Sequence, residues 1–331
     1  MKSSLLAILL PLHLQLVQTL PTRRGMPGSD VETLNYALGI EQLETAFFQH
    51  GLAKYSKESF KYQGFDDWVY ERFQQMAGHE KTHVKFLTKA IAAAGAVPVQ
   101  PCLYNFPHSD PKSFIEMGVM IENVVTSAFN GILPFVANKS FLTAFGSILG
   151  VEARHAGWIS SALLWVNPWN SAFETPLDAN QAFSWLSGFI ESCPHSTFHP
   201  SSPAFYAPPS HNNSSNSNPS FSNSYQHPYS DKPFPRFTLS PLARPGHTVH
   251  FDVDIPTEGL RGQQVFMHCI AGTGVYTSQV DVDKKTVYMP KGMKGVVYCL
   301  LSKEPKKVVD GTTIAGPAVV LCPFEADGKL H

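Results

Sequence analysis

Apolar side chains recur every three or four residues along several stretches of the first half of the chain, the spacing of one face of an α-helix. One stretch begins after Asp66, which favours the position before a helix, and ends at Gly95, which favours the position after one. In its middle, Glu80 and His83 lie one helical turn apart on the apolar face. The inward row that we predict is Val69, Phe73, Met76, Glu80, His83, Leu87 and Ala94.

A later stretch repeats this arrangement, with Glu152 and His155 as a second Glu-x-x-His pair. One such pair is common on solvated helix faces, but two pairs that are each centred in an apolar stripe indicate a shared role. The second stripe that we predict is Phe145, Ile148, Glu152, His155, Ile159, Ala162 and Val166.

The segments that precede the two stripes also resemble each other. "IEQLETAFF" (residues 40–48) aligns with "IENVVTSAF" (residues 121–129), which pairs Glu41 with Glu122. The first half of the chain is therefore predicted to be a duplicated helical hairpin.

The connection between the two hairpins, "VPVQPCLYNFPHSDP", contains prolines that exclude a helix. At about 3.3 Å per residue it can extend some 50 Å, roughly the length of a helix of 30 residues, so it can cross from one end of a bundle to the other. We predict a four-helix bundle with one long crossover. Residues 178–192 add a short fifth helix that places Phe183, Leu186 and Ile190 against the bundle.

Short alternating runs replace the helical pattern after residue 235. In "HTVHFDVDI", Val249, Phe251, Val253 and Ile255 alternate with polar residues, as expected for a half-buried strand. Similar runs follow between Gly-, Pro- and Lys-rich turns, which is typical of a β-sandwich. The predicted fold class is α+β, a helical bundle followed by a β-sandwich.

A Ser-, Asn- and Pro-rich segment, residues 194–235, separates the two parts. This composition cannot bury enough apolar surface to offset the entropy of ordering, so we expect a flexible linker. The predicted division is a leader at 1–24, the bundle at 30–193, the linker, and the β-sandwich domain at 236–331.

The first residues predict an exported protein. "MKSSLLAILLPLHLQLVQTLP" has one Lys and then an apolar run that is too short and interrupted to span a bilayer, as in a secretory signal peptide. An uncleaved tail is the alternative. Arg23 and Arg24 suit a dibasic processing protease, and no later apolar run reaches the ~20 residues of a membrane helix. We expect a secreted or cell-wall protein without a membrane span.

Charge and cysteine content narrow the function classes. The net charge of −1 and the lack of Lys/Arg-rich runs argue against nucleic-acid binding. The five cysteines match neither a dense disulfide scaffold nor a zinc pattern, and their odd number leaves at least one thiol free or shared between chains. Cys102 and Cys193 could pair at the end of the bundle. Sequons at Asn138, Asn212 and Asn213 fit an exported glycoprotein.

The acids at the centre of the apolar stripes need a counter-charge. Moving an ionised carboxylate into a packed core costs several kcal/mol. Four glutamates and two neutral histidines carry four negative charges, which two divalent cations would cancel. Helical bundles that supply one Glu from each of two helices and a Glu-x-x-His from each of the other two bind two metal ions in this way. The alternative is pairing with a basic side chain, but Lys81 and Arg154 neighbour the inward rows without belonging to them.

Residues 30–193 resemble the ferritin-like domain of fungal secreted stress-responsive proteins and plant desiccation-related proteins. The resemblance rests on "LNYALGIEQLETAFF", the two Glu-x-x-His motifs and "FETPLDANQAFSWLSGFIESCP", and "IAGPAVV" near the C-terminus extends it beyond the bundle. It implies that the metal ligands are Glu41, Glu80, His83, Glu122, Glu152 and His155.

The ferritin-like pattern further implies that Glu80 and Glu152 bridge two ions. Glu44 could replace Glu41 or act beside it; the internal repeat favours Glu41, because it pairs Glu44 with the apolar Val125. Carboxylate and imidazole ligands suit iron and manganese alike.

Two functions follow from such a site. The first is an oxidase or peroxide-consuming centre, in which the metal ligands are the only catalytic residues. The second is a non-enzymatic stress or surface protein with structural or scavenged metal, whose β-domain binds a cell-wall polymer or another protein.

Overall fold

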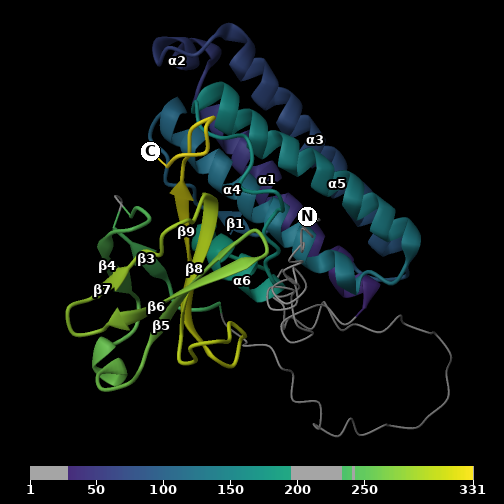
Figure 1. Cartoon of the computed structure of the whole chain (residues 1–331). Coiled ribbons are helices and arrows are strands. Elements are labelled where there is room, and N and C mark those ends of the chain that lie inside the picture. The colour runs from purple at the N-terminus through teal and green to yellow at the C-terminus, as the bar shows by residue number, and fades with distance from the viewer. Residues whose placement is uncertain (1–28, 195–232, 241–242, 331) are drawn as a thin grey trace, which may run out of the picture.

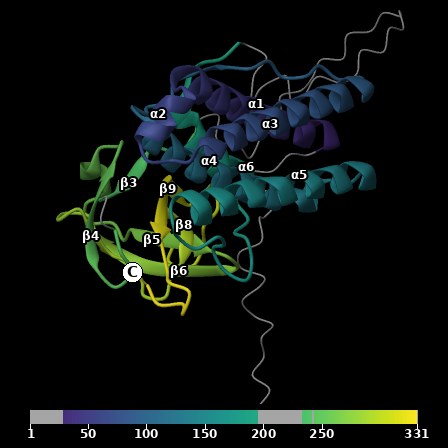
Figure 2. The ribbon, with the colours of Figure 1, turned by 90° about the horizontal axis from the view of Figure 1, so that it is seen from above.

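The computed structural model of the protein describes residues 29–194, 233–240 and 243–330. Four long helices of its first half lie side by side (Figures 1 and 2). A short helix, α2, connects the first pair, and α6 packs between the bundle and the last strand of a β-sheet. The bounds are α1 Asp30–Lys54, α2 Lys57–Tyr62, α3 Asp67–Ala93, α4 Pro111–Ile132, α5 Lys139–Trp158 and α6 Ala179–Leu186.

Polar side chains fix where the helices begin. At the start of α1, Ser29 and Glu32 each accept a hydrogen bond from the other's backbone amide, at 3.2 and 2.9 Å. At the start of α5, Asn138 accepts hydrogen bonds from the amides of Ser140 and Phe141. Such caps satisfy the first amides of a helix, which no helical carbonyl can reach.

The four helices are unequally buried. α1 and α4 are buried on nearly all sides, whereas α3 and α5 each bury one stripe and expose the opposite face. Side chains at the middle of α1 and α4 therefore lie deep in the protein, and those of the two stripes face them.

The two predicted stripes are correct at their centres and wrong at their C-terminal ends. Ala94 lies outside α3 and is exposed, because the chain turns at Gly95, which has a φ of 76°. α5 ends at Trp158 and continues only as a wider helical turn, Ile159–Leu163. Val166 therefore lies beyond the helix, after Trp165, whose positive φ of 57° stops the helical path.

The prediction of one helix over residues 178–192 is wrong in its second half. Helix α6 is followed by a 3-10 turn, Ser187–Phe189, and then by strand β2, Ile190–Ser192. β2 pairs antiparallel with β1, Leu103–Tyr104, which lies in the proline-rich crossover. The pairing partner is distant in the sequence, so the helical spacing of the apolar residues could not reveal it.

The second part of the chain is an antiparallel sheet of seven strands in the order β3-β4-β7-β6-β5-β8-β9. Its two edges adjoin, because the amide of Gly316 in β9 donates to the carbonyl of Pro235 just before β3, at 2.9 Å. The predicted α+β class, a bundle followed by a sandwich-like or barrel-like sheet, is confirmed. The strands are β3 Phe237–Leu239, β4 Thr248–Val253, β5 Phe266–Ala271, β6 Gly274–Asp281, β7 Thr286–Tyr288, β8 Gly295–Ser302 and β9 Thr313–Cys322.

The sheet packs directly on the bundle. Tyr298 of β8 is fully buried in the core of the bundle, where its hydroxyl lies 2.8 Å from that of Ser127 and donates to the carbonyl of Asn123 at 2.9 Å. The amide of Val296 donates to the side chain of Asn170, in the loop after α5, at 2.8 Å. The sheet thus covers α4, one of the two inner helices.

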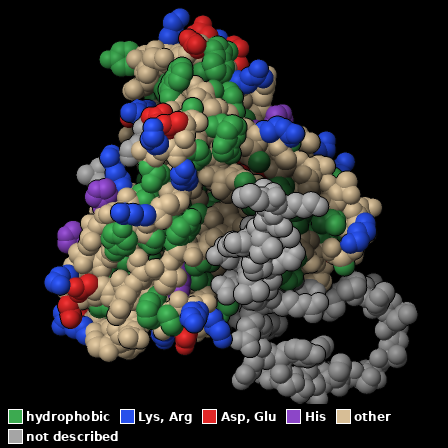
Figure 3. All heavy atoms as spheres, viewed as in Figure 1, with side chains coloured by type: hydrophobic (Ala, Val, Ile, Leu, Met, Phe, Trp, Pro, Cys, Tyr) green, Lys and Arg blue, Asp and Glu red, His purple; other side chains and the backbone are tan. Residues whose placement is uncertain are grey.

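Charged side chains of both signs are scattered over the face seen in Figure 3 without a large patch of one sign. None of the helices in the described residues has the length and apolar character to cross a membrane. The predicted leader, most of the predicted linker and the sequons at Asn212 and Asn213 lie outside the described residues.

Candidate metal centre

The structure brings the six predicted ligands together at the middle of the bundle, and each of the four long helices supplies at least one of them. Ligand atoms of Glu41, Glu80, His83 and Glu152 lie within 4.8 Å of one another, and so do those of Glu80, Glu122, Glu152 and His155. Two residues, Glu80 and Glu152, belong to both sets. We call these two sets the His83 subsite and the His155 subsite.

The His83 subsite is arranged around one ring nitrogen. Nδ1 of His83 lies 3.2 Å from Oε2 of Glu41, 3.1 Å from Oε2 of Glu80 and 3.1 Å from Oε1 of Glu152. Only Glu80 is on the same helix, so three helices meet at this nitrogen.

The His155 subsite mirrors this geometry. Nδ1 of His155 lies 3.2 Å from Oε1 of Glu80, 3.4 Å from Oε1 of Glu122 and 3.5 Å from Oε2 of Glu152. Each of the two shared glutamates therefore turns one oxygen toward His83 and the other toward His155. A carboxylate that divides its oxygens in this way is arranged to bridge two ions.

The carboxylates have little else to bind. Glu41, Glu80, Glu122 and Glu152 are completely buried. Apart from the ionic contacts with the two histidines described above, six of their oxygens lack a hydrogen-bond partner: Oε1 of Glu41, Oε1 of Glu80, and both oxygens of Glu122 and of Glu152. Buried polar atoms without partners are rare and costly in folded proteins. Hard acceptor oxygens combined with imidazole nitrogens suit iron and manganese, so the cluster fits divalent cations.

Basic side chains do not neutralise the cluster. Within the described part of the chain, the only cationic partners of these glutamates are the two histidines. Arg154 is exposed and donates to the carbonyl of Gly150 at 2.8 Å, and Lys81 is exposed as well. The alternative of a buried acid paired with Lys or Arg therefore has no support in the geometry.

The protonation of the cluster follows from burial and from charge. Burial, with repulsion from Glu152, raises the pKa of Glu41 well above its usual range, and burial does the same for Glu122. Burial also acts on Glu80, but its close contacts with His155 and His83 outweigh it and hold its pKa at about 2. Against the opposing effect of burial, the surrounding carboxylates raise the pKa of His83 to about 12. Without metal, protons thus balance the charge that cations would otherwise balance.

Glu44 is a seventh polar group at the cluster. It is fully buried, and neither of its carboxylate oxygens has a hydrogen-bond partner. Burial raises its pKa well above the usual range, and repulsion from Glu152, Glu122, Glu80 and Glu41 adds to this effect. It lies beside the two subsites without belonging to either set.

The sequence reasoning missed His79, which immediately precedes Glu80. Its Nδ1 lies 3.0 Å from Nε2 of His155, and the two rings are parallel, with centroids 5.3 Å apart. His79 lies outside the apolar stripe and is exposed, so the sequence pattern did not indicate a contact with His155.

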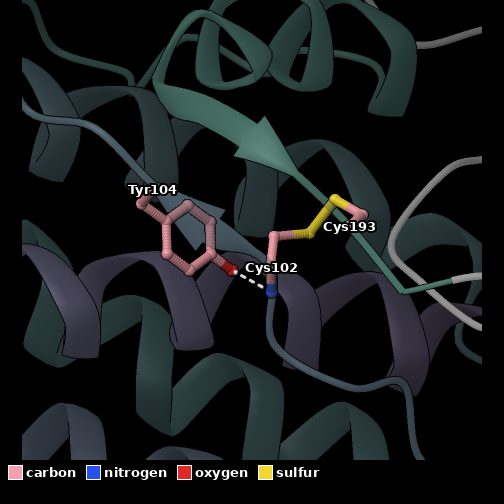
Figure 4. Close-up of a disulfide and its surroundings, with 3 residues drawn as sticks. All are labelled: Cys102, Tyr104 and Cys193. Atoms are coloured by element: carbon pink, nitrogen blue, oxygen red, sulfur yellow. Dashed lines mark hydrogen bonds between the residues drawn. A yellow bond between two sulfur atoms is a disulfide. The ribbon is translucent and has the colours of Figure 1, made fainter.

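The described residues contain two disulfides, one in each part of the protein. Cys102 and Cys193 are bonded beside the β1–β2 pair, where the amide of Cys102 donates to the hydroxyl of Tyr104 (Figure 4). The second, Cys269–Cys299, joins directly opposed residues of β5 and β8 and was not predicted. The fifth cysteine, Cys322, is buried as a free thiol, and burial raises its pKa to about 12.

Of the three predicted sequons, Asn138 lies in the described part of the chain. It is exposed at the start of α5.

Comparisons with known proteins agree with this geometry. Residues 29–164, which hold both Glu-x-x-His motifs and the paired glutamates, match the family model of the ferritin-like domain. The chain is also similar to Protein rds1 of Schizosaccharomyces pombe, at 25% identity over 322 residues, which covers 92% of this chain and 78% of that protein. The similarity to that protein thus extends well past the bundle. Residues 29–164 of this chain are thus similar to a ferritin-like domain, and they hold the candidate carboxylate and histidine metal site.

Proposed function

We propose that the protein binds two iron or manganese ions at the carboxylate and histidine cluster and uses them to oxidise Fe(II) or to consume peroxide. The observation that carries this proposal is the division of oxygens at Glu80 and Glu152, each of which faces both histidines. In this role Glu41 and His83 would complete one subsite, and Glu122 and His155 the other. Two such ions, when bound, supply redox chemistry with oxygen or peroxide that no side chain of the bundle offers.

The residues of this chain contribute a dry and charge-balanced site. Full burial of the glutamates excludes water, which strengthens their attraction for cations. The protons held by the histidines and by Glu41 and Glu122 leave when cations bind, so the total charge of the site changes little.

The test compares the purified full chain with two variants. Elemental analysis should find two Fe or Mn ions per wild-type chain, and the loaded protein should consume peroxide, or Fe(II) with oxygen. Glu80→Ala should lose both ions and the activity. Glu116→Ala removes an exposed carboxylate from α4 and should keep both. Equal rates in the loaded wild type and in Glu80→Ala would overturn the redox role.

We further propose that the protein is exported and acts in stress protection, at the cell wall or outside the cell. The two disulfides support an oxidising compartment. The apolar leader supports the route, and the likeness to fungal stress-responsive and plant desiccation-related proteins supports the setting. Mass analysis of the native protein, for the position of its first residue and a glycan at Asn138, tests the export.

A non-enzymatic binding role is the second candidate, and one surface feature favours it. Trp165, Trp169 and Phe173, in the loop after α5, expose 86%, 62% and 57% of their surface. Trp169 also lines a cleft of about 590 Å³ together with Tyr276 and Phe324. Large exposed aromatic groups beside a cleft often mark binding sites. Sedimentation with insoluble cell-wall polysaccharide tests this role, and Trp169→Ala should reduce the bound fraction if the cleft binds the polymer.

A further inference from the structure

His79 contacts the candidate metal centre from outside. It belongs to neither subsite, yet its Nδ1 lies 3.0 Å from Nε2 of His155. The other ring nitrogen of His155, Nδ1, faces Glu80, Glu122 and Glu152. The ring of His155 is therefore held between the carboxylates on one side and His79 on the other.

This contact determines which atom of His155 can bind a cation. A histidine that ligates metal through Nδ1 carries its proton on Nε2, and the partner of that proton fixes both the tautomer and the ring orientation. With the proton on Nε2 donated to Nδ1 of His79, Nδ1 of His155 is the nitrogen that can release its own proton and offer a lone pair to a cation among the carboxylates. The parallel rings, at an interplanar angle of 5°, restrict rotation further.

The internal repeat does not provide His83 with the same support. The repeat pairs Glu80 with Glu152, so the residue that corresponds to His79 is Val151. A valine side chain accepts no hydrogen bond. Among the described residues, His83 makes its hydrogen bonds through Nδ1, with Glu41 and Glu80.

We propose that His79 is a positioning residue for His155 and makes the two subsites unequal, so that the His155 subsite binds the first cation and the His83 subsite the second. This inference rests on the proposed dinuclear function. Outer partners of ligating histidines typically contribute about 10- to 100-fold to metal affinity, because they hold the ring in its binding orientation and raise its basicity.

The experiment titrates the metal-free full chain with Mn²⁺ and measures the free ion by electron paramagnetic resonance. The wild type should bind two ions in two separate steps. His79→Phe keeps a ring but removes the acceptor, so it should weaken the tighter step about 10- to 100-fold and leave the weaker step unchanged. His79→Asn places an amide oxygen near the position of Nδ1 and should restore most of the affinity. Val151→His offers His83 an acceptor and should tighten the weaker step.

The outcomes separate this inference from the function on which it rests. A wild type that binds fewer than two ions overturns both. Two ions bound in equal steps, or two steps that His79→Phe leaves unchanged, overturn the role of His79 alone. An equal loss in His79→Phe and His79→Asn also overturns it, because a hydrogen-bond acceptor would then not be the cause. Because His79 is exposed, thermal unfolding of the metal-free variants should match that of the wild type and exclude a folding defect.

Discussion

Oε1 of Glu80 lies 3.2 Å from Nδ1 of His155, while its other oxygen lies 3.1 Å from Nδ1 of His83. The first contact joins α3 to α5, and the second stays within α3. Glu152 repeats this relationship from α5: one of its oxygens contacts His83 on α3, and the other contacts His155 on its own helix. The two helical hairpins are thus connected through a pair of shared carboxylates at the centre of the bundle.

Replacing a glutamate that both subsites share should reduce the number of bound ions more than replacing a glutamate of one subsite. Glu80 belongs to both subsites and Glu41 to one, so we expect Glu80→Gln to lose both ions and Glu41→Gln to keep one. The affinity lost with a direct ligand should exceed the about 10- to 100-fold that outer partners contribute. Elemental analysis after dialysis gives the ions per chain. Equal loss in the two variants would contradict the assignment of Glu80 as a bridge.

The stability of the metal-free protein should fall as pH rises above about 6.5. The pKa of His83 is raised to about 12, so the stability that its protonation contributes is complete below its usual value of 6.5 and is lost as pH rises toward 12. The raised pKa of Glu41 and of Glu122 acts in the same direction above 4.5. One such group loses up to about 2 kcal/mol between pH 6.5 and 8.

Bound cations should reverse this trend, because their affinity for deprotonated ligands increases with pH. Thermal unfolding at pH 6, 7.5 and 9, with Mn²⁺ and with a chelator, checks both directions. A midpoint that does not change with pH in the chelated sample would contradict the protonation proposed for the cluster. The lowered pKa of Glu80 acts in the opposite direction, but only below pH 4.5.

Replacing Glu44 should stabilise the metal-free protein. Its carboxyl group is buried without hydrogen-bond partners among four other glutamates, so Glu44→Gln removes the cost of keeping a buried acid protonated at neutral pH. We expect a gain of about 1–3 kcal/mol in the free energy of unfolding, because each pKa unit of the upward shift costs about 1.4 kcal/mol at neutral pH; chemical denaturation of the chelated protein measures it. The ion count of the same variant decides between Glu41 and Glu44. Two ions would keep Glu44 outside the ligand set, whereas one would make it a ligand.

The hydroxyl of Tyr298 should contribute to the contact between sheet and bundle. Tyr298→Phe removes its hydrogen bonds to Ser127 and Asn123, which are both in a fully buried setting. We expect a loss of about 1–2 kcal/mol in the free energy of unfolding. Tyr288→Phe, at an exposed position in β7, is the matched control and should change little. No difference between the two would show that the buried hydroxyl adds nothing to the interface.

Thiol labelling should find one free cysteine per chain. Cys102–Cys193 and Cys269–Cys299 are bonded, and Cys322 is buried with a raised pKa. A maleimide should therefore not react with the folded native protein, and it should add once after unfolding without reductant. Five additions would place the protein in a reducing compartment and contradict export.

Local patterns were sufficient to predict much of the candidate centre. The faces of α3 and α5 follow from the spacing of their residues, because positions three and four apart share one side of any helix. The pairing of Glu41 with Glu122 needed only the internal repeat. The prediction of a helix over residues 178–192 was wrong in its second half, because the end of this segment pairs with β1. Helical spacing cannot reveal a strand partner elsewhere in the chain.

The sequence by itself thus determined the two Glu-x-x-His faces, the repeat that supplies two more glutamates, and the change from helices to strands. Only the tertiary structure decided that Glu80 divides its oxygens between two histidines, that His79 contacts His155, and that Tyr298 enters the core of the bundle. The physical reason is that periodicity orients a side chain about its own helix or strand. Distances between elements depend on how the complete core packs.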